Sequence, residues 1–327
     1  MRNILVTGSA GHLGEALMRT LNASSAQRRF RAIGLDVLPS PFTDRVGSIV
    51  DRAFVAEAMR GIDTVLHAAT LHKPHVATHT RQDFVDVNIT GTLNLLEEAV
   101  GAGVRAFVFT STTSTFGHAL APSSTEPAAW ITEEVAPIPK NIYGVTKVAA
   151  ENLCDLTHRL HGLPCIVLRT SRFFPEDDDL VERCDAHTDA GLQQCVNLNE
   201  LLHRRADIDD IVSAHLLAIE KAAAIGFGRY IISATSPFTN DDLRDLRGRA
   251  TSVVKRRVPA YEAEYARRGW TMPEEIDRIY VNQRARNELG WRPKFDFASS
   301  IARLEAGEDF RSELARAVGA RGYHRKR

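Results

Sequence analysis

Tyr143 and Lys147 lie four positions apart in the segment 141–147. In a helix this spacing places both side chains on one face, where the ammonium can approach the phenol. A nearby cation favours the phenolate and prepares a tyrosine for proton transfer as a general acid or base. The same spacing is common on surface helices, so the elements around the pair must decide whether it is catalytic.

A glycine-rich turn near the start of the chain predicts a nucleotide site. The apolar run Ile4–Val6 is followed by this turn and then by leucines at helical spacing, which indicates a strand, a turn and a helix. Glycines in such a turn let a pyrophosphate approach the helix N-terminus, whereas the alternative is a turn without a ligand. The residues expected to hold the cofactor here are Gly8, Ala10, Gly11, His12, Leu13 and Gly14.

An acidic residue ends the second predicted strand. That strand covers residues 30–35, and Asp36 follows it, 22 residues beyond Gly14. A carboxylate at this place can accept hydrogen bonds from both adenosine ribose hydroxyls and repels a 2′-phosphate. The expected cofactor is therefore NAD rather than NADP.

Strands and helices alternate through the first half of the chain. The predicted strand 64–69 ends in the small residues Ala68 and Ala69, a long helix is expected over 84–100, and the strand 107–109 runs into the hydroxyl-rich segment 110–115. This rhythm predicts a right-handed, mostly parallel, doubly wound sheet, which binds ligands beyond the carboxyl ends of its strands. His67, inside an apolar strand, is interpreted as structural rather than catalytic.

Bulk composition narrows the class of protein. The 327 residues carry 41 basic and 41 acidic side chains, so no net charge points to nucleic acid or to an anionic membrane. No apolar run reaches the length of a membrane span and no signal peptide is expected, which favours a cytoplasmic protein. The four cysteines form no C-x-x-C pair and are interpreted as reduced thiols, and no metal site is expected.

Taken together, these motifs resemble the extended short-chain dehydrogenase/reductase family, the NAD-dependent sugar epimerases, dehydratases and dehydrogenases. The match runs from Thr7-Gly8-x-x-Gly11-x-x-Gly14 through Asn88-x-x-Gly91-Thr92 and Tyr143-x-x-x-Lys147 to Glu288-Leu289-Gly290-Trp291. The predicted fold is α/β, a doubly wound parallel Rossmann sheet with a smaller, mixed α/β C-terminal part that binds substrate. The NAD-binding domain is expected over 1–170, with 205–235 returning to it, and the substrate-binding part over 171–204 and 236–320.

The resemblance also implies roles for particular residues. Tyr143 would exchange a proton with a substrate hydroxyl as hydride passes to or from nicotinamide, Lys147 would lower its pKa and hold the nicotinamide ribose, and Thr112 would position the reacting oxygen. Further cofactor contacts are expected from Ser48, Ile49, Ala68, Ala69, Asn88 and Thr110, and substrate contacts from His72, Ser111, Thr113 and Ser114. The helices 84–100 and 143–161 would pair with their twins in a homodimer.

Departures from the family's pattern bear on the substrate. Arg172 stands where nucleotide-sugar enzymes carry an asparagine, and His203 stands where they carry an arginine, although Arg204 and Arg205 follow it. The stretch 169–176 instead resembles uronate dehydrogenases, which oxidise free sugar acids, and Arg172 could bind a substrate carboxylate. The alternative is a solvent-facing arginine paired with an acidic residue of 176–179.

These observations leave three functions open. The first is an NAD-dependent enzyme that oxidises a secondary alcohol of a sugar or sugar-derived substrate. The second is a UDP-sugar 4-epimerase or dehydratase that returns the hydride, and the third is a non-catalytic NAD-binding regulatory protein. Retention of Thr112, Tyr143 and Lys147 together argues against the third. Tyr261, Tyr265 and Trp270 either line a sugar pocket or pack in a core.

Overall fold

The computed structural model describes residues 2–23, 29–123, 125–175 and 190–320. The chain forms two compact units. The first comprises Met1–Gly117, Pro137–Arg169 and Val212–Tyr230, and the second His118–Ala136, Thr170–Ile211 and Ile231–Arg327. Residues 118–136 were expected in the cofactor part but belong to the second compact unit. The assignment of cofactor and substrate to the two parts stays a prediction.

The first unit is built on a seven-stranded sheet, whose strands have the order β3-β2-β1-β4-β5-β7-β8. β1 pairs in parallel with β2 and β4, and β4 pairs in parallel with β5. Because several of these strands are buried on both faces, they are continuous apolar runs rather than alternating ones. The predicted doubly wound α/β fold is confirmed. The strands are β1 Arg2–Thr7, β2 Phe30–Asp36, β3 Arg45–Val46, β4 Thr64–His67, β5 Ala106–Thr112, β7 Cys165–Thr170 and β8 Phe227–Ile232.

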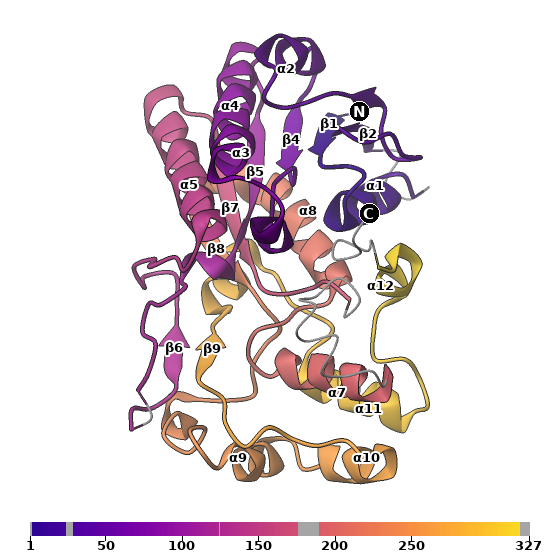
Figure 1. Ribbon diagram of the computed structural model, residues 1–327. Helices are drawn as coiled ribbons and strands as arrows, with labels where there is room; N and C mark the ends of the chain where they lie inside the picture. The colour runs from indigo at the N-terminus through magenta and orange to yellow at the C-terminus, as the bar shows by residue number, and fades with distance from the viewer. Residues whose placement is uncertain (1, 24–28, 124, 176–189, 321–327) are drawn as a thin grey trace. The chain divides into compact units, whose positions relative to one another are not determined.

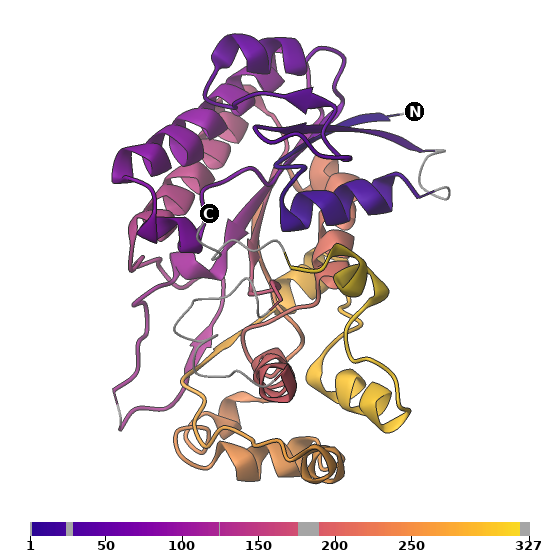
Figure 2. The ribbon, with the colours of Figure 1, turned by 45° about the vertical axis from the view of Figure 1, so that its right-hand side comes forward.

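Helices cover both faces of this sheet. α4 (Gly91–Gly101) and α5 (Ile142–His161) lie side by side on one face, and α1 (His12–Leu21) lies on the other (Figures 1 and 2). α2 (Arg52–Ala58) has Asp51 as its N-cap, whose carboxylate accepts from the Phe54 amide. α8 (Ile208–Ile225) contributes its residues from Val212 onward to this unit.

The long helix expected over 84–100 is helical throughout but contains a π-helical turn. α3 (Arg81–Val85) runs into this turn at Asp86–Thr90, and α4 follows it directly. A π turn holds one extra residue, and the apolar spacing of the sequence did not indicate it. The turn carries Asn88, whose side chain is buried.

The second unit has its own apolar core. β6 (Ala129–Ile131) pairs in parallel with β9 (Arg278–Tyr280), and the helices of this unit are α7 (Ala190–Leu201), α9 (Ala250–Arg257), α10 (Tyr261–Arg268), α11 (Phe297–Glu305) and α12 (Glu313–Val318). Tyr261, Tyr265 and Trp270 are buried in this core in edge-to-face contacts, so they pack rather than line a pocket. A 3-10 turn covers Asn240–Asp242.

In the part of the chain that the structure describes, no helix combines the length and the hydropathy that crossing a bilayer requires.

Candidate active site

The glycine turn joins β1 to α1 by a close backbone approach. Gly8 has a positive φ of 75° and its carbonyl accepts from the Gly11 amide at 3.0 Å. A Cβ at Gly14 would lie 1.9 Å from the Gly8 oxygen, so only glycine fits there. Gly11 occupies the N-cap without a side-chain cap, which leaves the first turn of α1 to an anion. The cradle fits a dinucleotide pyrophosphate.

Asp36 ends β2 beside this turn, as the sequence predicted. Its Oδ2 accepts from the Ala10 amide at 3.0 Å and its Oδ1 from the Leu38 amide at 2.9 Å. These two bonds fix the carboxylate next to the glycine turn, and each oxygen retains capacity for another donor such as a ribose hydroxyl. The geometry fits the adenosine ribose of NAD.

Ser48 and Ile49 lie after β3, in a segment that is hydrogen-bonded to Asn94, a residue that was not singled out from the sequence. The Asn94 amide on α4 donates to the carbonyls of Ile49, at 3.1 Å, and Val50, at 3.0 Å. Ile49 is buried against Gly91, where an added Cβ would come within 2.6 Å of the isoleucine side chain. The signal for Asn94 was present in the sequence, since it is a polar residue on the apolar face of a leucine-rich helix.

His67 connects three elements of the core. Its Nδ1 lies 2.8 Å from Thr7 Oγ1 on β1, and its Nε2 lies 2.9 Å from Thr92 Oγ1 on α4. Thr92 donates its hydroxyl to the Asn88 carbonyl, so Nε2 carries the proton and Nδ1 accepts. Burial lowers the pKa of His67 well below its usual value, with a further contribution from the Lys147 charge. A neutral imidazole that is hydrogen-bonded through both of its nitrogens has a structural role.

Asn88, expected to contact the cofactor, makes four hydrogen bonds within the protein. Its Nδ2 donates to the Leu71 carbonyl and to Thr146 Oγ1, and its Oδ1 accepts from the Leu71 amide and Thr70 Oγ1. Two donors and two acceptor sites are the full capacity of an amide side chain. Asn88 therefore ties the segment after β4, which includes Ala68 and Ala69, to α5, and its expected direct contact with the cofactor stays a prediction.

The hydroxyl residues at the end of β5 divide between the faces of the sheet. Thr110 Oγ1 lies 2.8 Å from His215 Nε2 on α8, whereas Ser111 Oγ donates to Glu151 on α5 at 2.5 Å. Adjacent strand residues point to opposite faces, so Ser111 lies in the core under α5, and its expected contact with a substrate stays a prediction. The other predicted substrate contacts of this unit are near the strand end or on the loop after β4, namely Thr113, Ser114 and His72.

Thr112 at the end of β5 and Tyr143 on α5 lie near each other. Asn141 caps α5 by accepting from the Gly144 amide at 3.1 Å, and this start places Tyr143 and Lys147 in successive turns of one buried face. The Thr112 side chain lies near the Tyr143 phenol. Burial raises the pKa of Tyr143 to about 12, and the nearby Thr112 side chain offsets part of that rise. Lys147 is not among the causes of this shift, so its expected lowering of the Tyr143 pKa stays a prediction.

Lys147 is 2% exposed, and its Nζ lies 4.2 Å from the centre of the Phe109 ring. Burial lowers the pKa of this ammonium to about 7, while Glu151 and Cys154 act in the opposite direction. An ammonium with a pKa this low titrates near neutrality, so its charge depends on its neighbours.

Glu151 was not singled out from the sequence, although it stands four positions beyond Lys147 on the same helical face. It is 1% exposed and forms an ion pair with Arg169, whose Nη2 lies 2.7 Å from Oε2. Arg229 approaches the same oxygen at 3.4 Å. The sequence signal was a charged residue at a position that helical periodicity places in the core.

Arg172 lies in the second unit, where it meets an acidic partner that the sequence did not indicate. Its Nη1 is 3.3 Å from Glu200 Oε1, and Arg204 and Arg205 bind the same carboxylate. The expected alternative partners in 176–179 lie outside the described residues. His203 is buried and neutral, because burial and the Arg204 charge lower its pKa to about 3. Three guanidiniums thus surround one carboxylate in the described part of this unit.

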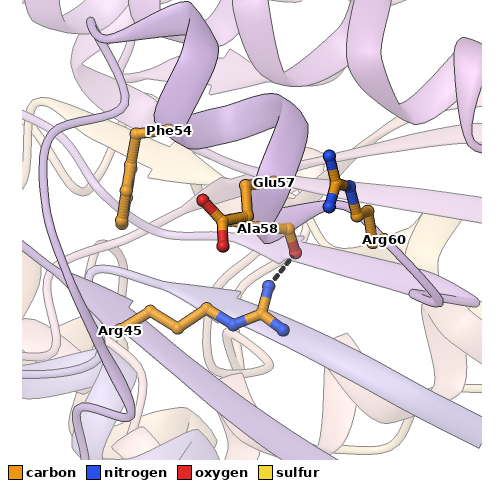
Figure 3. A pocket seen from close by; sticks show the side chains of 5 residues that line it. All are labelled: Arg45, Phe54, Glu57, Ala58 and Arg60. Carbon is orange, nitrogen blue, oxygen red and sulfur yellow. Dashed lines mark hydrogen bonds between the residues drawn. The ribbon is translucent and has the colours of Figure 1, made fainter.

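A surface hollow elsewhere on the first unit contains none of the predicted residues. It is lined by Arg45, Phe54, Glu57, Ala58 and Arg60 and has a volume of about 390 Å³ (Figure 3). The Arg45 guanidinium donates to the Ala58 carbonyl across its floor. The hollow lies between β3 and α2.

Comparison with known proteins agrees with the motifs. Residues 4–232 match the NAD dependent epimerase/dehydratase family. A dTDP-glucose 4,6-dehydratase of Streptomyces antibioticus is 30% identical over 92% of this chain and 90% of its own length. The uncharacterized protein y4nG of Sinorhizobium fredii is 32% identical over 52% of this chain, which spans 40% of that protein. Other relatives are UDP-glucose 4-epimerases.

Solved structures show the same fold. A short-chain dehydrogenase/reductase superfamily protein from Agrobacterium tumefaciens with bound NAD superposes with a TM-score of 0.62 at 23% identity, covering 94% of this chain and 98% of that chain. With more than half of its length matched, the chain belongs to the NAD dependent epimerase/dehydratase family and is an NAD-dependent enzyme.

Proposed function

We propose that the protein oxidises a secondary alcohol of a sugar or sugar-derived substrate, with Tyr143 as the acid/base. The observation that carries this proposal is the placement of Thr112, at the carboxyl end of β5, near the buried Tyr143, one helical turn from Lys147. A hydroxyl beside a buried phenol fixes the point at which a substrate oxygen would exchange its proton. A protein that only binds NAD has no use for this arrangement.

Tyr143, Thr112 and Lys147 each have a separate role in this oxidation. When bound, NAD accepts the hydride from the carbon that carries the reacting hydroxyl. Tyr143 takes the proton of that hydroxyl as the C=O bond forms, and Thr112 holds the oxygen in line. Lys147, when charged, favours the phenolate that this transfer needs. Burial of the pair excludes water, so each charge acts more strongly than it would in solvent.

For the substrate, we propose an anionic group bound by the guanidiniums around Glu200. Arg172 and Arg204 are only partly buried, with 22% and 35% of their side chains exposed. Guanidinium binds carboxylate and phosphate bidentately, so this cluster suits a sugar acid or a sugar diphosphate. Arg172, in a stretch that resembles uronate dehydrogenases, favours the free sugar acid.

A second candidate is a UDP-sugar 4-epimerase or dehydratase, in which the hydride returns to the substrate. It is favoured by the extent of the likeness to the Streptomyces antibioticus dehydratase, which covers nearly all of both chains. The two candidates share the same first step at Tyr143 and differ in whether NADH is released.

A panel of free sugars, uronic acids and nucleotide sugars, incubated with NAD and followed by NADH absorbance, separates the two. NADH accumulating with a sugar acid supports the dehydrogenase, whereas a nucleotide sugar converted without net NADH supports the epimerase or dehydratase. Tyr143→Phe is the matched control, expected to bind NAD normally and to lose at least about 100-fold in turnover. Unchanged turnover in that variant would contradict the role of Tyr143.

We also propose that the protein pairs with a second copy through α5. Val145, Leu156 and Leu160 are 49%, 40% and 65% exposed and lie on one face of this helix. Such a face supports a helix-to-helix interface, as the family resemblance implies. Leu160→Glu should convert a dimer to a monomer in light scattering, and a monomeric wild type would contradict the proposal. The cytoplasmic location stays a prediction from the sequence.

A further inference from the structure

Glu151 occupies a position that the proposed chemistry does not use directly. It lies one turn beyond Lys147 on α5, and its carboxylate is enclosed by β5 and β7 beneath the helix. Ser111 Oγ donates to its Oε1 at 2.5 Å, and Arg169 Nε and Nη2 reach it at 3.0 and 2.7 Å. A carboxylate held by this many donors is fixed in position.

Burial disfavours the charged form of Lys147, so a nearby negative charge is needed to keep its ammonium protonated. The other neighbours of Lys147 do not supply this charge. Phe109 offers the face of its ring at 4.2 Å. His67 on β4 is held neutral by burial, and burial raises the pKa of Cys154, so that thiol is protonated at neutral pH. Tyr143, whose pKa burial raises, is neutral as well. Among these groups Glu151 carries the charge that opposes the loss of the lysine proton.

We propose that Glu151 is a positioning residue that keeps Lys147 charged, and that Arg169, Arg229 and Ser111 set the strength of this effect. The alternative is that Glu151 and Arg169 form a buried ion pair that only joins α5 to β7. The positive charges of the two arginines partly cancel the effect of the Glu151 charge on Lys147, while Ser111 fixes the carboxylate without adding charge. The proposal rests on the proposed function only in giving Lys147 a catalytic task.

The two readings differ in the signs of their effects. Glu151→Gln keeps the shape of the side chain but removes its charge, so the pKa of Lys147 should fall by at least about one unit. Arg229→Met removes a competing cation that is 24% exposed, and should therefore raise the pKa of Lys147. A pair that only joins two elements would lower stability in both variants without moving this pKa in opposite directions.

The experiment is an NMR titration of the whole protein labelled with ¹³C at lysine Cε. The chain has seven lysines, and Lys147→Met identifies the one resonance that titrates near neutrality. Glu98→Gln is the control, since it breaks the ion pair between Glu98 on α4 and Arg52 on α2 and should leave Lys147 unchanged. NADH binding measured across the same pH range should lose affinity at a lower pH in Glu151→Gln than in wild type.

A Lys147 pKa that is unchanged in Glu151→Gln would overturn the proposal. If that variant does not fold, an unchanged or lowered pKa in Arg229→Met would do the same. Neither measurement needs a substrate. Failure of the proposed oxidation would therefore appear only in the NADH-release assay, and failure of the positioning role only in the titration.

Discussion

The Asn88 side chain donates a 3.0 Å hydrogen bond to the Thr146 hydroxyl, which stands directly before Lys147 and itself donates to the Tyr143 carbonyl. Through this chain of bonds, the π-helical turn that precedes α4 supports the first turns of α5. The two residues are 58 positions apart, yet together they fix the backbone that carries Tyr143 and Lys147.

Asn88→Ala should therefore weaken both stability and cofactor binding. It removes four hydrogen bonds and leaves the buried Leu71 backbone groups without partners, which costs about 2 to 3 kcal/mol in the free energy of unfolding. Urea denaturation measures the loss, and NADH titration should show weaker binding. Asn287→Ala, at an exposed amide bonded to Gln283, is the matched control and should change neither quantity. If NADH affinity fell without loss of stability, Asn88 would have to touch the cofactor after all.

Lys147→Met should abolish turnover and raise the melting temperature. Burial lowers the pKa of Lys147 to about 7, below the ordinary value of 10.5, so folding disfavours its charged form. This penalty is complete below pH 7, and it disappears as the pH rises from 7 to 10.5. The variant's advantage, a few degrees at pH 7, should therefore shrink toward pH 10 in thermal melts. A lower melting temperature at pH 7 would show that the ammonium stabilises the fold.

Asp36 sets the choice of cofactor in our interpretation. Asp36→Ala removes the carboxylate that faces the ribose site and also the acceptor of the Ala10 amide, so NAD affinity should fall at least about tenfold. Binding of NADP should fall less or improve, because the repulsion of its 2′-phosphate is lost. Calorimetric titration with each cofactor measures the ratio. Tighter binding of NADP than NAD by the wild type, with no change in Asp36→Ala, would refute the assignment.

The sequence could predict the features that depend on local pattern. The glycine turn, Asp36 at the end of its strand, and the helix that presents Tyr143 and Lys147 all follow from spacing along a single element. What it could not show were the partners brought by the fold. Ser111 was expected at the substrate but lies under α5, where it binds Glu151. The sequence does not show which face of β5 this helix covers. Arg172 forms an ion pair with Glu200, which lies 28 positions further along the chain. No motif or regular spacing in the sequence indicated this pair.

Gly14 provides a test of the cofactor cradle that separates shape from helix propensity. Alanine is the better helix former by about 1 kcal/mol, so Gly14→Ala would stabilise α1 if nothing stood in the way. Its Cβ would instead lie 1.9 Å from the Gly8 oxygen, which forces the turn apart. We expect a lower melting temperature and a loss of NADH binding. Gly101→Ala, at the end of α4 with nothing within 4 Å of the added carbon, is the control and should be neutral or stabilising with NADH affinity unchanged. If Gly14→Ala bound NADH as tightly as this control, the close approach of α1 to the Gly8 carbonyl would not be what shapes the cofactor site.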